Sequence, residues 1–206
     1  FWGDSAQFSP DGQSIVSTSG DDTVRVWSAA TGECVHTLVG HSDEVTSAQF
    51  SPDGQSIVSA SGDKTVRVWS AATGECVHTL VGHAFGVNSA QFSPDGQSIV
   101  STSGDSTVRV WSAATGECVH TLVGHAFGVN SAQFSPDGQS IVSTSGDKTV
   151  RVWSAATGEC VHTLVGHSDM VNCAQFSLDG QSIVSASGDE MVRVWDLHVL
   201  KDIQDL

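Results

Sequence analysis

Residues 41–82 read HSDEVTSAQFSPDGQSIVSASGDKTVRVWSAATGECVHTLVG, and nearly the same 42 residues follow again from position 83. Segments 84–125 and 126–167 differ at one position only, where Ser106 stands against Lys148. A fixed period of this length is typical of repeat architectures, in which each unit packs against its neighbours. The tryptophans mark five units at equal spacing: Trp27, Trp69, Trp111, Trp153 and Trp195.

Each unit has the pattern of four short strands separated by turns. The Pro-Asp-Gly turn at 52–54 is the clearest break, because proline presets φ and glycine tolerates positive φ. The pattern predicts strands over 45–51, 56–61, 65–69 and 75–81, and no window shows a sustained helical period. Four short strands cannot bury both of their faces alone. We therefore expect an all-β chain whose units stack side by side around an axis.

The motifs of the unit occur in a fixed order along nearly the whole chain. Gly-His is followed by Phe-Ser-Pro-Asp-Gly, then Ser-x-Ser-Gly-Asp, then Val-Arg-Val-Trp. In this combination the chain resembles the WD-repeat family. The aspartate that usually follows the tryptophan is present only as Asp196, and the other units have serine there. The resemblance implies a β-propeller of five four-stranded antiparallel blades. We expect one propeller domain over residues 1–206, with blades at about 1–40, 41–82, 83–124, 125–166 and 167–206.

The phase of the repeat bears on ring closure. The sequence starts inside a first strand, and residues 201–206 keep the apolar positions of a fourth strand. Every blade is then contiguous, so we expect a closed monomer in which blade 1 packs against blade 5. A domain-sharing oligomer is the alternative. An open arc would instead expose the apolar side chains of the end blades, Ile15, Val16, Ile183 and Val184.

Composition restricts the partners and the compartment. Eight Lys and Arg stand against 23 Asp and Glu, for a formal charge of −15, which opposes binding to nucleic-acid phosphates. No apolar run is long enough to span a membrane. Four of the five cysteines recur one per unit, which is not the pattern of a disulfide framework. We expect reduced thiols and a cytoplasmic, intracellular location, with no nucleic-acid or membrane partner.

Every complete unit carries a His, a Ser, an Asp and a Trp, which superficially suggest a Ser-His-Asp catalytic triad. An active site needs one activated nucleophile, whereas this set occurs four times. In the WD-repeat family such residues form a structural tetrad, so we expect no enzymatic activity. Choosing Ser101 over Ser103 leaves an alternative open, because both lie on one strand face. The expected tetrads are His41, Ser59, Asp63 and Trp69; His83, Ser101, Asp105 and Trp111; His125, Ser143, Asp147 and Trp153; and His167, Ser185, Asp189 and Trp195.

A second candidate for chemistry is the Cys-x-His pair that recurs in the fourth strand, as in Cys76 and His78. Tetrahedral zinc needs three or four protein ligands, and each blade supplies only two. The Gly-Asp-Lys-Thr run at 62–65 lacks the spacing of a phosphate-binding loop. The sequence therefore predicts no metal, no nucleotide and no other cofactor.

The positions that differ between units lie mainly in the loop before the first strand and in the turn after the second. In the family both open on the same face of the ring, where variable aromatic and charged side chains indicate a binding surface. We predict a macromolecular interaction or scaffold module whose partner is a protein or peptide. A structural or engineered repeat protein with no natural partner is the alternative. The predicted binding residues are Phe1, Trp2, Asp43, Phe85, Phe127, Met170, Lys64 and Lys148.

Overall fold

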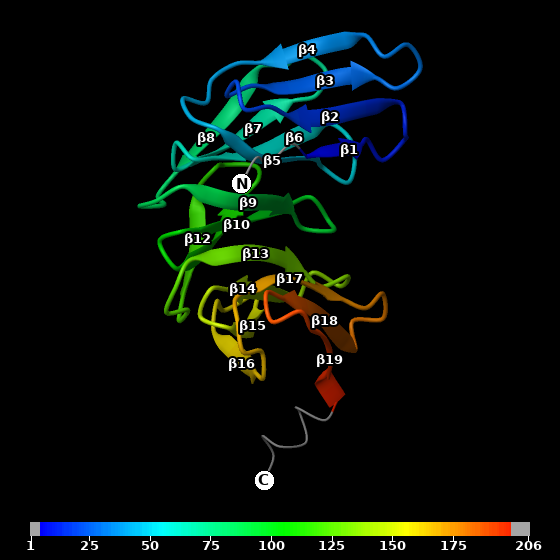
Figure 1. The fold of residues 1–206 in the computed structure, drawn as a ribbon. Coiled ribbons are helices and arrows are strands. Elements are labelled where there is room, and N and C mark those ends of the chain that lie inside the picture. Colours follow the sequence, from blue (N-terminus) through cyan, green and yellow to red (C-terminus); the bar gives the residue numbers. More distant parts are fainter. Residues whose placement is uncertain (1–4, 199–206) are drawn as a thin grey trace.

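The computed structural model describes residues 5–198. Within these residues, nineteen β-strands form five antiparallel sheets, coloured from blue to red along the chain in Figure 1. No helix in this part of the chain has the length and apolar character needed to cross a membrane. The strands are β1 (Ala6–Phe8), β2 (Ser14–Thr18), β3 (Val24–Ser28), β4 (Cys34–Leu38), β5 (Val45–Phe50), β6 (Ser56–Ser61), β7 (Thr65–Ser70), β8 (Cys76–Val81), β9 (Val87–Phe92), β10 (Ser98–Ser103), β11 (Thr107–Ser112), β12 (Cys118–Val123), β13 (Val129–Phe134), β14 (Ser140–Ser145), β15 (Thr149–Ser154), β16 (Cys160–Val165), β17 (Val171–Phe176), β18 (Ser182–Ser187) and β19 (Val192–Asp196).

The predicted all-β fold of five antiparallel blades is confirmed. Blades 1 to 4 contain four strands each, in the order in which they occur along the chain. In blade 2 each observed strand agrees with its predicted range to within one residue at either end. Blade 5 has three strands among the described residues. The fourth strand predicted for it, 201–206, lies outside them.

The Pro-Asp-Gly turn of blade 2 is held by its own side chains. Gly54 has φ +71° and donates its amide to the carbonyl of Ser51 at 2.8 Å. The carboxylate of Asp53 accepts the Ser51 hydroxyl at 2.6 Å and the Gln55 amide at 3.0 Å. These bonds satisfy the polar groups of the turn locally, so β6 begins directly after it.

Strand β7 shows how a blade buries both of its faces. Successive residues of a strand point to opposite sides. Val66 and Val68 therefore pack toward blade 3, whereas Trp69 packs toward blade 1 against Val16 and Val24. The same division recurs in four apolar clusters, one at each contact between neighbouring blades. The core of the described residues thus consists of four repeated blade interfaces.

The described residues form an open arc, so the predicted closure of blade 1 on blade 5 is wrong for this part of the chain. Substantial strand contacts join each blade to the next, from β2 and β5 to β14 and β17. Within residues 5–198 no comparable set of strand contacts joins β17–β19 to β1–β4. Figure 1 places these two blades at opposite ends of the arc. The physical reason is that the packing of each blade interface sets the rotation between blades. That rotation is too small for five blades to complete a turn.

The residues that the arc exposes differ from those expected for it. Val16 and Ile183 are fully buried, because they face blade 2 and blade 4. Val184 is exposed and Ile15 is half-buried, because these two point away from the rest of the arc. Neighbouring residues of one strand face opposite sides, so only one of each adjacent pair lies on the uncovered face.

Candidate functional site

A continuous chain of hydrogen bonds crosses blade 2. The indole Nε1 of Trp69 donates to Ser59 Oγ at 2.8 Å, and Ser59 Oγ lies 2.8 Å from His41 Nε2. His41 Nδ1 lies 2.8 Å from Asp63 Oδ2. Ser59 is fully buried, and the His41 and Asp63 side chains are nearly so. The structure therefore brings together the four residues of the predicted tetrad in this blade.

Blades 3, 4 and 5 repeat this arrangement with matching distances. In each case the serine is the one aligned with Ser59, and the serine two residues later serves another contact. In blade 1 the position aligned with His41 falls before Phe1 of the given sequence. Trp27 Nε1 of that blade still donates to Ser17 Oγ at 2.8 Å, while Asp21 pairs with Arg25 at 2.7 Å.

Burial and hydrogen bonding set the charges in the tetrads. Burial lowers the pKa of His83 below its usual value, although the hydrogen bond to Asp105 acts in the opposite direction. Burial raises the pKa of Asp105, but bonds from Thr107, the Ala84 amide and His83 outweigh it and lower the pKa to about 2. A neutral histidine beside an ionised aspartate fixes the direction of donation. Trp111 donates to Ser101, Ser101 donates to His83 Nε2, and His83 Nδ1 donates to Asp105.

The tetrad offers no route to nucleophilic catalysis in this structure. A serine nucleophile must be reached by the substrate carbonyl and needs donors for the resulting oxyanion. The tetrad serines of blades 2 to 5 are buried, and each accepts a tryptophan N–H in place of facing solvent. This arrangement suits a structural network, because all its buried polar groups have partners.

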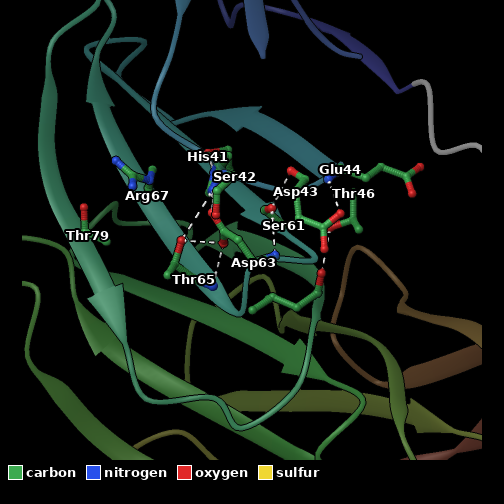
Figure 2. A network of polar contacts seen from close by, with 12 residues as sticks. His41, Ser42, Asp43, Glu44, Thr46, Ser61, Asp63, Thr65, Arg67 and Thr79 are labelled. Atoms are coloured by element: carbon green, nitrogen blue, oxygen red, sulfur yellow. Dashed lines mark hydrogen bonds and ion pairs between the residues drawn. The ribbon is translucent and has the colours of Figure 1, made fainter. Parts of the chain in front are cut away.

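The tetrad aspartate also positions the loop before the first strand. In blade 2, Asp63 Oδ2 accepts the amide of Ser42 at 3.1 Å, while its Oδ1 accepts the Thr65 hydroxyl at 2.7 Å. Ser61 Oγ donates to the carbonyl of Asp43 at 2.8 Å, and Figure 2 shows Ser61 between Asp43 and the Asp63 turn. Hydrogen bonds to the backbone thus flank the variable side chain. The same bonds to carbonyls hold Phe85 and Phe127, from Ser103 and Ser145.

These loops and the turns after the second strands make up the surface that we call the loop face: residues 42–44, 62–64, 84–86, 104–106, 126–128, 146–148, 168–170 and 188–190. Within it, Phe85 and Phe127 are 62% and 65% exposed. Asp43, Lys64, Lys148 and Met170 are exposed as well. Lys148 Nζ donates to the carbonyl of Ser168 in the next blade at 2.9 Å, which links neighbouring loops. The predicted binding residues Phe1 and Trp2 lie outside the described residues.

Sequence reasoning missed the backbone conformation of the variable turn position. Lys64 and Lys148 have φ +72°, and the aligned residues of the other blades are also between +65° and +67°. Side chains other than glycine rarely adopt this left-handed conformation. Asparagine or glycine would have signalled the turn, but the five units carry Asp22, Lys64, Ser106, Lys148 and Glu190 there.

The arginine of the third strand is a second residue that the sequence did not single out. The Arg67 guanidinium lies over the Trp69 ring, 5.8 Å from its centroid, and Arg67 Nη1 is 3.8 Å from Cys76 Sγ. Arg109 and Arg151 stack on their tryptophans in the same way. The signal was present as the repeated Val-Arg-Val-Trp, in which alternate residues share a strand face.

The side chains of the repeated Cys-x-His pair contact backbone carbonyls. In the described part of the chain, no group of three or more His, Cys, Asp or Glu lies close enough to hold a metal ion. Cys76 Sγ donates to the carbonyl of His78 at 3.4 Å, and His78 Nε2 lies 3.2 Å from the carbonyl of Ala114 in the next blade. All five cysteines are unpaired and exposed.

Comparisons with known proteins agree with this geometry. The family described as "WD domain, G-beta repeat" matches the chain five times, over residues 4–28, 32–70, 74–112, 116–154 and 158–196. A 41-residue segment, 20% of this chain, is 56% identical to F-box/WD repeat-containing protein 7 of Drosophila melanogaster. The segment covers 3% of that protein, so the likeness extends over one repeat length and a small part of the relative.

Proposed function

Because the chain belongs to the WD-repeat family, whose repeats generally mediate protein–protein interaction and scaffolding, we propose that it binds a protein or peptide on the loop face. WD-repeat propellers are typically scaffolds and not enzymes, which agrees with the inaccessible tetrad serines. The observation that carries the proposal is the exposure of Phe85 and Phe127 on one face. Exposed aromatic side chains in a cluster mark interaction surfaces, and aromatic residues are enriched among binding hot spots.

The backbone below these side chains is already in place. Ser103 Oγ donates to the carbonyl of Phe85 at 3.0 Å, and the Ala84 amide donates to Asp105 at 2.9 Å. A loop that is fixed before binding loses little conformational freedom when a partner docks. The rings of Phe85 and Phe127 therefore supply contact area without a large ordering cost.

The left-handed turn residues support the same surface. A non-glycine residue in this conformation costs about 1–2 kcal/mol, and strain of this kind clusters at functional sites. Glycine would remove the cost, yet none of the five variable turn positions carries it. Keeping charged or polar side chains there, such as Lys64 and Lys148, is consistent with contact to a partner.

The available positive charge supports a protein partner over a nucleic acid. Three of the eight basic side chains, Arg67, Arg109 and Arg151, lie against tryptophan rings, and Arg25 pairs with Asp21. A phosphate backbone would meet few free cations on a chain with a formal charge of −15. An intracellular location, where thiols stay reduced, fits the five unpaired cysteines.

The test compares two double variants in affinity capture. Phe85→Ser with Phe127→Ser removes the aromatic rings from the loop face. Val77→Ser with Val119→Ser removes exposed apolar side chains, each 54% exposed, from the outer strands β8 and β12. We expect the first variant to lose specific partners while the second and the wild type retain them.

All three proteins should have the same circular dichroism and melting temperature, because the substituted side chains are exposed. If all three capture the same set of proteins, the loop face is not the binding surface. If none captures a specific partner, the result supports the alternative, a structural or engineered repeat protein with no natural partner. The near identity of the units is the sequence feature that suggests this alternative.

A further inference from the structure

Blade 5 leaves an apolar face uncovered at one end of the arc. Within residues 5–198, Val184, Val192 and Val194 are 39%, 66% and 73% exposed. The corresponding valines of blades 1 to 4 are no more than 3% exposed, because the next blade covers them. Three exposed valines on neighbouring strands of one sheet make a contiguous patch of the kind that marks an interaction site.

At the other end of the arc, blade 1 leaves uncovered a face that carries aromatic side chains in place of valines. Phe8 is 65% exposed, whereas the aligned Phe50 and Phe176 are 7% and 6% exposed. Trp27 is half-buried, although the aligned Trp69 is fully buried against blade 1. In the repeated interfaces, the surface that packs on such a face presents valines.

These two faces are the two halves of an interface that the chain makes four times. At each blade interface, valines of one blade pack against an Ala, a Phe, an Ile and a Trp of the next. The uncovered valines of blade 5 supply the first half. The uncovered Phe8, Ile15 and Trp27 of blade 1 supply the second half. The repeated interfaces therefore show which surface each face is built to meet.

Polar groups fix the register of the same interface. Asn88 Nδ2 donates to the carbonyl of Val129 in the next blade at 2.7 Å, and Asn130 Nδ2 donates to that of Val171 at 2.8 Å. Asn172 has the same place in blade 5 and is exposed at the end of the arc. The position of blade 1 that aligns with Val129 is residue 3, which lies outside the described residues.

We propose that a second copy of this chain covers these faces head to tail, with blade 5 of one copy packed on blade 1 of the other. Within residues 5–198 of one copy the two faces lie at opposite ends of the arc and do not meet (Figure 1). A second copy carries the complementary face in full. Two chains with a formal charge of −15 repel each other, and added salt screens this repulsion, so association strengthens as the salt concentration rises.

The test uses two charged substitutions, each of which blocks one face. Val194→Lys places a charge on the blade 5 face, and Phe8→Lys places one on the blade 1 face. Val165→Lys is the matched control, because Val165 is 74% exposed but lies on the outer strand β16. Sedimentation velocity from about 1 to about 100 µM spans the range of micromolar affinities. Equal melting temperatures at low concentration check that the variants fold.

We expect the wild type and Val165→Lys to reach at least twice the monomer mass of 21.4 kDa as concentration rises. Val194→Lys and Phe8→Lys should each remain monomeric. Their equimolar mixture should form a dimer and stop there, because one intact face remains on each variant. A wild type that stays monomeric throughout overturns the proposal. So does a Val194→Lys variant that assembles like the wild type, or a mixture that stays monomeric.

Discussion

Replacing Ser101 by alanine removes the middle of the blade 3 tetrad. Ser101 Oγ accepts the Trp111 indole N–H and lies against His83 Nε2, each at 2.8 Å. Alanine leaves that buried donor and that buried acceptor without partners. Each unsatisfied group costs about 1–3 kcal/mol, so the free energy of unfolding should fall by at least about 2 kcal/mol. For a chain of this size that loss lowers the melting temperature by about 4–8 °C.

Blade 1 provides the control, because the position aligned with the tetrad histidine falls before Phe1 of the given sequence. Among the described residues Ser17 Oγ accepts the Trp27 N–H at 2.8 Å, and Trp27 is half-buried. Ser17→Ala deletes the same hydroxyl but leaves one donor that water can reach, so it should cost less than about 1 kcal/mol. Calorimetric melting of both variants measures the difference. Equal losses of melting temperature would refute the reasoning, since the cost would then not come from the histidine network.

Stability should fall as the solution is acidified. The folded pKa of His83 lies below 6.5 and that of Asp105 is about 2, below 3.8, so the unfolded chain takes up protons first in both cases. The free energy of unfolding from these groups is fully present above pH 6.5, falls below that pH as the histidines become charged, and falls again between pH 3.8 and about 2. An unchanged urea midpoint from pH 7 to pH 5 would contradict this prediction. Ser106→Gly should raise the free energy of unfolding by about 0.5–1 kcal/mol, because glycine relieves the left-handed φ of +67°. A lower urea midpoint would show that no strain is stored there. The five exposed cysteines should all react with a thiol reagent in the native protein, and elemental analysis should find no zinc after dialysis. Zinc that is retained by the wild type and lost in Cys76→Ser would disprove the metal-free prediction.

The repeat unit made the local fold predictable, because each of its signals acts over a few residues. The Pro-Asp-Gly turn ends one strand. In the third strand Val66 and Val68 define one apolar face and Trp69 the other, so both faces must be buried by neighbouring blades. From the sequence we assign Ser59 to the tetrad over Ser61, but the pattern alone does not distinguish the two. The two share a strand face, and only the hydrogen bonds show that Ser61 holds the Asp43 carbonyl instead.

Ring closure was not predictable, because it depends on a rotation that no single repeat encodes. The angle between neighbouring blades follows from how Trp69 and its neighbours fit between the valines of blade 1. Small changes in that fit add up over the four blade interfaces. Contiguous blades and matched terminal strands carry no information about this angle. The left-handed φ of Lys64 was missed for a related reason, since lysine has no preference for that conformation.

The position of the variation follows from the way the loops are held. The tetrad carboxylate of Asp63 binds the amide of Ser42, and Ser61 binds the carbonyl of Asp43. Both bonds go to the backbone, so the side chain at the position of Asp43 can change without loss of either. Blade 3 has Phe85 there with the corresponding backbone bonds. A buried network that fixes only the main chain thus separates the stability of the blade from the chemistry of the loop face. Substitutions of Phe85 should consequently alter binding far more than folding.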